Sequence, residues 1–287
     1  AIDESKRNGY KSIFLLTGVP GAGKTLAGLN LANSRRKSDE TNEEHTVFLS
    51  GNGPLVRVLS ESLARDAKDN YGKKISDARR ETTSFIQNIH HFRDECIKNE
   101  NPPLERIVIF DEAQRAWHLE KTRNFMQTKK GIPDFNSSEP DFLIGAMNRH
   151  KGWAVIVCLI GGGQEINDGE GGMEEWLRAL KDHYPEWQVW TSYQLDSRYY
   201  LPTFDLKNLR GRLIKSEHLH LGVSIRSFRS EKVSKAITSL LEDEKEEALK
   251  SFREISDFYP IKITRSIEKA KEWLRAKARG SERFGIL

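Results

Sequence analysis

The sequence predicts an α/β fold built around a doubly wound parallel sheet. Three apolar runs have the length and composition of strands that are buried on both faces: residues 13–16 (IFLL), 107–110 (IVIF) and 153–160 (WAVIVCLI). Helical patterns lie between these runs, and glycine or acidic residues follow them. Because ligands of such sheets bind beyond the carboxyl ends of the strands, we expect the functional site in the loops after these runs.

The first run leads into a phosphate-binding loop. Residues 18–25 (GVPGAGKT) fit the spacing GxxxxGK[ST], with a strand before them and an amphipathic helix over 26–32 after them. The glycines let backbone N–H groups approach phosphate oxygens at the positive end of the helix. Lys24 is expected to reach the β- and γ-phosphates, and the Thr25 hydroxyl to hold Mg²⁺. The residues expected to contact the nucleotide are Gly18, Pro20, Gly21, Ala22, Gly23, Lys24, Thr25 and Leu26.

A second strand, loop and helix follow the first. Residues 47–50 (VFLS) indicate the strand, residues 51–54 (GNGP) break it, and helical periodicity continues to residue 63. The segments 33–46 and 66–83 are polar and charged, so we place them on the surface. Basic side chains in the second segment are expected to be solvated rather than bound to phosphates.

The run at 107–110 ends in an acidic pair, Asp111 and Glu112. Asp111 is expected to hold Mg²⁺, and Glu112 to orient or deprotonate the water that attacks the γ-phosphate. Adjacent carboxylates are usually only solvated side chains. Their place at the end of a buried strand, in the same chain as a phosphate-binding loop, makes them candidates for nucleotide hydrolysis.

Two later positions are weaker candidates. Gln164 follows a strand and three glycines, where its amide would approach the γ-phosphate or the attacking water, although a simple glycine turn explains the pattern equally well. Arg226 and Arg229 lie at a strand-to-helix junction, from which an arginine would stabilise charge in the transition state. An ordinary surface role is the stronger reading of these arginines from the residues alone.

The character of the sequence changes at about residue 204, and we expect two domains. Residues 1–203 form the nucleotide-binding domain, and residues 204–287 form part of a second, truncated α/β domain. In the second part, alternating or apolar stretches predict strands and charged periodic stretches predict helices. The predicted strands are 218–225 and 260–264, and the predicted helices are 234–252 and 267–278.

Composition indicates a soluble globular protein. The 287 residues are 37% hydrophobic and 31% charged, and a net charge of +4 permits a polyanionic partner without establishing one. Two cysteines far apart in the sequence cannot build a disulfide framework, which favours a cytoplasmic protein. The longest apolar run is too short to cross a bilayer, so no membrane association is expected. His90 and His91 lack a third metal ligand at suitable spacing and are expected to be structural.

The order of these motifs resembles that of superfamily 1 helicases. The matching strings are GVPGAGKT at 18–25, FLSGNGPL at 48–55, VIFDEAQRAW at 108–117, CLIGGGQEIN at 158–167 and SIRSFRS at 224–230. The chain is most similar to the bacterial family of Schlafen group 3-type DNA/RNA helicase domains, in which DEAQRAW and GGGQEIN are close to signature strings. The resemblance covers nearly the whole chain.

The resemblance implies an ATP- and Mg²⁺-dependent helicase or translocase, which hydrolyses ATP between two RecA-like domains and moves along single-stranded DNA or RNA. It implies that Gln164 couples the γ-phosphate to the strand-binding surface, that Asn52 contacts the nucleic-acid backbone, and that Arg229 is the arginine of the fourth motif. The chain departs from the pattern in two ways. No glutamine that would read adenine occurs in residues 1–11, and the later motifs of the second domain are not found.

Two other classes of function stay open at this point. A nucleotide-dependent switch or regulatory ATPase would use the same pocket without moving along nucleic acid, and strand-stimulated ATP turnover would separate it from a motor. A small-molecule kinase would need an acceptor pocket and a lid, and the acidic pair with the glycine-rich glutamine loop argues against it. The sequence does not determine the oligomeric state.

Overall fold

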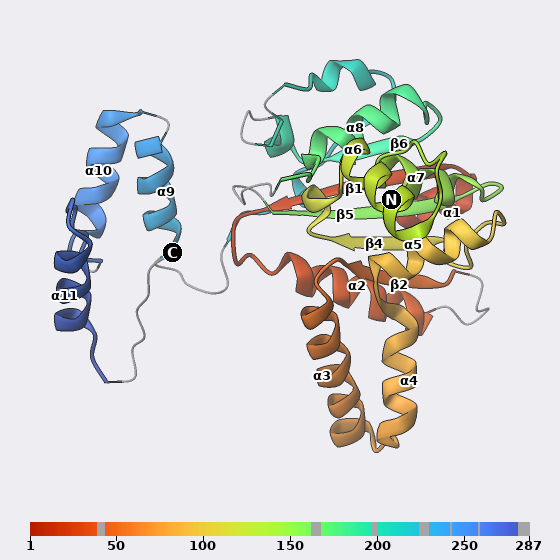
Figure 1. The fold of residues 1–287 in the computed structure, drawn as a ribbon, viewed down its shortest axis with the longest axis horizontal. Coiled ribbons are helices and arrows are strands. Elements are labelled where there is room, and N and C mark those ends of the chain that lie inside the picture. The colour runs from red at the N-terminus through yellow and green to blue at the C-terminus, as the bar shows by residue number, and fades with distance from the viewer. Residues whose placement is uncertain are drawn as a thin grey trace. The chain divides into compact units, whose positions relative to one another are not determined.

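The computed structural model describes residues 1–38, 44–161, 168–196, 200–201, 203–223, 230–241, 243–257 and 259–280. The chain consists of two compact units, Ala1–Arg226 and Ser227–Leu287. The first unit holds every strand that the described residues form (Figure 1). No helix in these ranges is long and apolar enough to cross a membrane.

The first unit is built on an eight-stranded sheet, in which each pair of neighbours among the described strands is parallel. The order is β3-β2-β4-β5-β1-β6-β7, and β8 pairs with the end of β1. This arrangement confirms the predicted α/β fold class, with the strand of the phosphate-binding loop inside the sheet. The bounds are β1 Lys11–Gly18, β2 Thr46–Ser50, β3 Ile86–Asn88, β4 Ile107–Asp111, β5 Ala154–Gly161, β6 Gln188–Thr191, β7 Leu213–Lys215 and β8 His220–Leu221.

Helices cover both faces of this sheet, and each face has its own hydrophobic core. On one face Ile13 and Leu15 of β1 pack in a cluster with residues of α5, α7 and α8, whereas Phe14 packs on the other face with residues of α2 and α4. Burial on both sides explains why the central strands are continuous apolar runs. The helices of this unit are α1 Ile2–Asn8, α2 Lys24–Ser38, α3 Gly53–Tyr71, α4 Ile75–Phe85, α5 Ile89–Lys98, α6 Leu119–Phe125, α7 Glu139–Asn148 and α8 Gly172–Asp182.

Short helical turns occupy several connections of the first unit. Four are 3₁₀ helices and one, which continues α6, is a π-helical turn. The 3₁₀ turns are Ala113–Arg115, Tyr193–Asp196, Leu206–Leu209 and Glu217–Leu219, and the π turn is Met126–Lys130.

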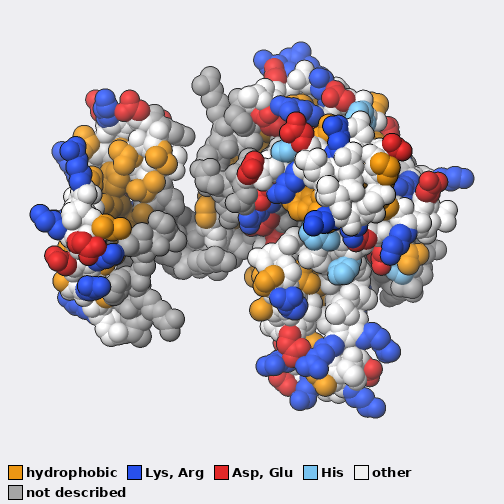
Figure 2. Space-filling view, viewed as in Figure 1, with side chains coloured by type: hydrophobic (Ala, Val, Ile, Leu, Met, Phe, Trp, Pro, Cys, Tyr) orange, Lys and Arg blue, Asp and Glu red, His pale blue; other side chains and the backbone are white. Residues whose placement is uncertain are grey.

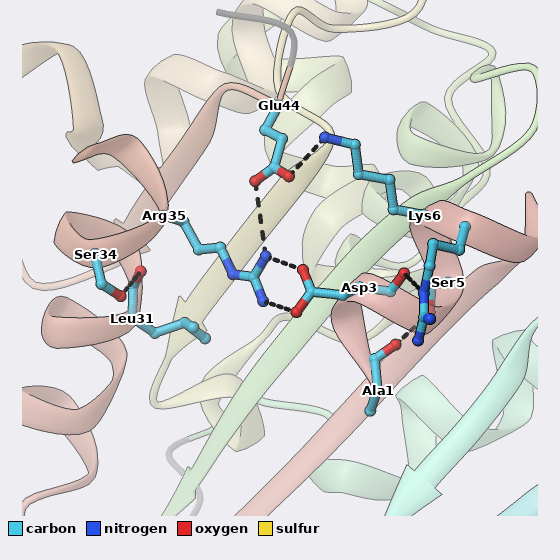
Figure 3. A network of polar contacts seen from close by, with 9 residues as sticks. Ala1, Asp3, Ser5, Lys6, Leu31, Ser34, Arg35 and Glu44 are labelled. Atoms are coloured by element: carbon cyan, nitrogen blue, oxygen red, sulfur yellow. Dashed lines mark hydrogen bonds and ion pairs between the residues drawn. The ribbon is translucent and has the colours of Figure 1, made fainter. Parts of the chain in front are cut away.

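An ion-pair network joins the N-terminal helix to the sheet. Arg35 of α2 forms a bidentate pair with Asp3 of α1, and its Nη1 lies 3.9 Å from Glu44 Oε2, just before β2 (Figure 3). Lys6 Nζ lies 2.9 Å from Glu44 Oε1. The network therefore fixes three elements that are separated in the sequence, α1, α2 and the start of β2.

The charged segment after the second strand forms a helical hairpin of α3 and α4, which projects from the sheet (Figure 1). Gly72 ends α3 with a φ of 66°, a left-handed conformation that glycine adopts easily. Basic and acidic side chains are mixed at the far end of the hairpin (Figure 2). Two of its basic residues are engaged in ion pairs, Arg79 with Glu61 at 2.9 Å and Lys73 with Glu81 at 2.6 Å.

The first unit extends past residue 203, where the sequence places the domain boundary. Strands β7 and β8 lie after that residue, yet β7 pairs with β6 and β8 pairs with β1. Within the range 218–225, where a strand was predicted, the strand formed by the described residues is β8. The boundary at 203 and the second RecA-like domain at 204–287 stay predictions.

The described part of the second unit is helical. Its helices are α9 Ser230–Leu241, α10 Lys245–Ile255 and α11 Ile267–Lys277. The prediction of a strand at 260–264 was wrong, because these residues form no regular element. Ile263 is 96% exposed, and among the described residues no strand pairs with this segment.

Candidate nucleotide-binding site

A cavity of about 1050 Å³ lies at the carboxyl ends of the sheet strands. It is lined by the phosphate-binding loop, by residues 50–52 at the end of β2, by Ile89 and His90 after β3, and by residues 111–113 at the end of β4. These segments come from four different strand ends, as expected for a ligand site of a doubly wound sheet. The volume is that of a site for a cofactor-sized molecule.

The phosphate-binding loop runs from the end of β1 to the start of α2. Gly21 and Gly23 have φ values of 76° and 87°, which side chains other than glycine rarely adopt. Lys24 Nζ donates to the carbonyl oxygens of Gly18 at 2.8 Å and Val19 at 3.1 Å, so the ammonium lies over the loop. Of the residues expected to contact nucleotide, those that line the cavity are Pro20, Gly21, Gly23, Lys24, Thr25 and Leu26.

Two predicted nucleotide contacts do not line the cavity. Ala22 is buried, and Gly18 lies against β8. A Cβ atom at Gly18 would lie 3.0 Å from both Cβ and the carbonyl oxygen of Leu221, so glycine favours the close approach of β8. The same β8 residue accepts a hydrogen bond from the Val19 N–H at 3.0 Å.

The predicted metal ligands Thr25 and Asp111 are in contact. Thr25 Oγ1 donates to Asp111 Oδ1 at 3.0 Å across a separation of 86 residues. Asp111 is only 6% exposed, and within the described part of the chain its Oδ2 has no hydrogen-bond partner. Burial raises the pKa of Asp111 to about 6, and the charge of Glu112 also raises it.

This pair fits a magnesium ion. Mg²⁺ prefers oxygen ligands and binds through one or two carboxylates, with water and substrate phosphates completing its shell. A buried carboxylate oxygen without a partner, beside a hydroxyl and a phosphate-binding loop, is such a donor. Within the described ranges no group of three or more His, Cys, Asp or Glu residues could hold a metal by itself.

The Glu112 side chain lines the cavity next to this pair. Its backbone is left-handed, with φ 53° and ψ 46°, which is uncommon for a residue other than glycine. Gln114 Nε2 donates to Glu112 Oε2 at 2.5 Å. Sequence reasoning missed Gln114, although its place in the DEAQ string is a signal that could have identified it.

The cavity continues from the phosphate-binding loop toward Asn52, His90 and Trp117. Asn52 is the N-cap residue of α3, and its side-chain oxygen accepts the backbone N–H of Leu55 at 3.2 Å. The His90 and Trp117 rings lie 5.5 Å apart, and burial lowers the pKa of His90. The structure therefore places Asn52, predicted to contact nucleic acid, on the wall of the cavity.

A buried ion pair supports Trp117 from behind. Arg93 is fully buried, and its Nη1 donates to Glu139 Oε1 at 3.1 Å. The guanidinium also lies over the rings of Trp117 and Phe125, at 5.6 and 5.0 Å from their centroids. Glu139 Oε2 accepts the backbone N–H of Trp117 at 3.1 Å, and burial raises the pKa of Glu139.

Gln164 and Arg229 lie outside the described residues, as does Arg226. The strand that leads to Gln164 is β5, which pairs with β1 on one side and β4 on the other. The roles of all the predicted site residues stay predictions.

Comparison with known proteins shows similarity to one protein family and to solved structures. The sequence profile of the Schlafen group 3, DNA/RNA helicase domain matches residues 11–287. A solved structure, the Hef helicase domain of Pyrococcus furiosus, is 14% identical, with a TM-score of 0.35. That match covers 70% of this chain and 38% of the Hef chain, so this chain spans less than two-fifths of it. No curated protein sequence matches significantly.

Proposed function

Since this chain belongs to the Schlafen group 3 DNA/RNA helicase domain family, we propose that it is an ATP- and Mg²⁺-dependent motor acting on single-stranded DNA or RNA. A helicase-like domain of this family implies nucleotide hydrolysis and nucleic-acid binding in general terms. The choice of ATP, the metal and movement along a strand are the finer parts of the proposal.

One observation carries the proposal. The phosphate-binding loop, Thr25 and Asp111, whose Oδ2 has no hydrogen-bond partner among the described residues, line one large cavity at the strand ends. Leaving a buried carboxylate oxygen without a partner costs free energy, and such a cost is common where a ligand supplies the missing contact. This supports a site for a metal-bound nucleotide more than a structural turn.

Each residue of the site has its own role in the proposed reaction. Backbone N–H groups of the loop and Lys24 bind the phosphates, and Thr25 with Asp111 would hold Mg²⁺. When bound, the ion supplies charge neutralisation at the phosphate oxygens. Glu112 orients the attacking water and accepts its proton.

Three further residues complete the proposal. Gln164 would couple the γ-phosphate to the strand-binding surface, and Arg229 would stabilise transition-state charge. Asn52, whose position on the cavity wall is exposed, would contact the nucleic-acid backbone.

The test is ATP hydrolysis with and without single-stranded DNA or RNA at low salt, where strand binding is strongest. Turnover should rise with the added strand. Lys24→Ala should lose both Mg·ATP binding and turnover. Glu112→Gln should keep binding and lose turnover by about 10²- to 10⁴-fold, the contribution of a general base.

Matched controls are Lys98→Ala and Glu100→Gln, which change the same residue types at exposed positions near the far end of α5. Both should hydrolyse ATP as the unmodified protein does. Tight Mg·ATP binding without strand stimulation would favour a nucleotide-dependent switch. Full turnover in Lys24→Ala would contradict the proposed site.

A further inference from the structure

We infer that Gln114 is a positioning residue, which holds the Glu112 carboxylate for hydrolysis by tying it to the end of β5. The inference rests on the proposed function, because it concerns the residue that acts on the attacking water. It adds a residue to the site that touches neither the phosphates nor the metal ligands.

Glu112 needs such support because of its backbone. Its left-handed conformation lies outside helix and strand geometry, so no regular element directs its side chain. The side chain lines an open cavity, where a free carboxylate would sample several rotamers. A contact that selects one rotamer therefore has a direct effect on the position of the carboxylate.

Gln114 supplies such a contact, because its side-chain amide forms one hydrogen bond through the nitrogen and another through the oxygen. Nε2 donates to Glu112 Oε2 at 2.5 Å, and Oε1 accepts the N–H of Gly161 at 3.1 Å. A carboxylate can only accept and a backbone N–H can only donate, so the two partners determine the orientation of the amide. Gln114 is 5% exposed, and it acts on the cavity through Glu112.

The second contact connects Glu112 to the strand beside the phosphate-binding loop. Gly161 is the last residue of β5, and it is directly in register with Gly18 of β1, the first residue of the loop. The distance from Glu112 to the bound phosphates would thus be controlled through one amide and two paired strands.

The backbone of the acidic turn has anchors that do not involve Gln114. Trp176 Nε1, fully buried, donates to the Ala113 carbonyl oxygen at 2.9 Å. The Ala116 carbonyl oxygen accepts the N–H of Gly171 at 2.7 Å. Substitution of the Gln114 side chain should therefore move the Glu112 carboxylate and leave the turn in place.

Two variants and one control test the inference. Gln114→Glu keeps an acceptor for Gly161 but places a negative charge against Glu112, and Gln114→Leu removes both hydrogen bonds. Gln127→Glu is the matched control, because Gln127 is an exposed residue whose amide donates to the Pro133 carbonyl oxygen at 2.8 Å. Single-turnover ATP hydrolysis and the Kd of Mg·ATP are measured for each.

Both Gln114 variants should hydrolyse ATP about 10- to 100-fold more slowly, the cost of a misplaced catalytic group, with the Kd of Mg·ATP unchanged. The control should match the unmodified protein. In the Glu112→Gln background the Gln114 substitutions should add little further loss, because two residues that act as a unit are not additive.

Several results would overturn the inference. One is a Gln114→Glu protein that hydrolyses ATP as fast as the unmodified protein, and another is a Gln114 variant that binds Mg·ATP more weakly. A third is a Gln114 substitution that slows hydrolysis as much in the Glu112→Gln background as in the unmodified protein. The fourth is failure of both Gln114 variants to fold. If the unmodified protein hydrolyses no ATP, or Glu112→Gln is fully active, the proposed function fails as well. The unmodified protein and Glu112→Gln thus separate the two failures.

Discussion

Arg93 and Glu139 place two opposite charges in the wall of the candidate site, where both side chains are almost completely buried. Arg93 Nε and Nη2 have no hydrogen-bond partner in the described ranges, so the pair is incompletely satisfied. Such a pair contributes little net stability, yet removal of one member leaves an uncompensated buried charge. Glu139 lines the cavity with Trp117, and Arg93 lies over the Trp117 ring, so the pair holds this part of the cavity wall.

We expect Arg93→Met to lower the free energy of unfolding by about 3–5 kcal/mol at neutral pH. Without Arg93 the folded-state pKa of Glu139 rises further above its unfolded value, so stability falls as the pH rises through the interval between the two. The deficit should therefore be larger at pH 8 than at pH 5. Urea unfolding at both pH values measures it.

The matched control is Arg65→Met, whose partner Glu61 is partly exposed. It should lower the free energy of unfolding far less than Arg93→Met does, because surface pairs contribute little. The double variant Arg93→Met/Glu139→Gln should recover most of the loss, because the side chain at 139 becomes neutral and still accepts the Trp117 N–H. A cost for Arg93→Met as small as that of the control would contradict the argument.

At the scale of the element, helix α2 carries the phosphate-binding loop and lies directly on the sheet. Gly28 allows this approach: a Cβ there would lie 2.6 Å from Leu159 Cδ1, 3.1 Å from Phe48 Cε2 and 3.2 Å from Ile109 Cγ2. All three of these residues are buried. The glycine therefore sets the distance between the helix and the three strands beneath it.

We expect Gly28→Ala to destabilise the protein, although alanine is favoured over glycine in helices by about 1 kcal/mol. Overpacking in a dense core costs about 1–3 kcal/mol, which exceeds the gain in propensity. Chemical unfolding measures the difference, and Asn30→Ala, on the exposed side of the same helix, is the control. Stabilisation in Gly28→Ala equal to that in the control would refute the close approach.

At the scale of the whole molecule, the two units differ in how much they bury. β4 and β5 are buried along their whole length, whereas α11 has no buried residue. In the second unit, Leu240 and Leu249 expose 54% and 57% of their surface, and apolar side chains are visible on α9 and α10 (Figure 2). Few buried contacts imply a low free energy of local opening.

The rate of amide hydrogen exchange should therefore differ between the two units. Amides of β1, β4 and β5 should exchange slowly and those of α9 to α11 quickly, and Mg·ATP should slow exchange at 18–25 and 111–113. Mass spectrometry of peptides measures this, with Lys24→Ala as the control that should show no effect of nucleotide. Equal protection of the two units would contradict the prediction.

The sequence by itself determined the fold class, the order of the central elements and the family. Residues 107–110 and 154–160 are apolar throughout because both faces of a central parallel strand are covered. The phosphate-binding loop and the acidic pair at 111–112 are visible because each consists of neighbouring residues whose spacing is itself the signal. Local patterns of this kind can be recognised without knowledge of the tertiary fold.

Only the tertiary structure decided which distant residues meet. The contact between Gln114 and Gly161 joins positions 47 residues apart, and that between Arg93 and Glu139 joins positions 46 apart. The same limit explains the strand wrongly expected at 260–264, since an alternating pattern becomes a strand only where a neighbouring strand is available. Hydrogen bonds and burial depend on the residues that the fold brings together. A periodicity in the sequence does not identify those residues.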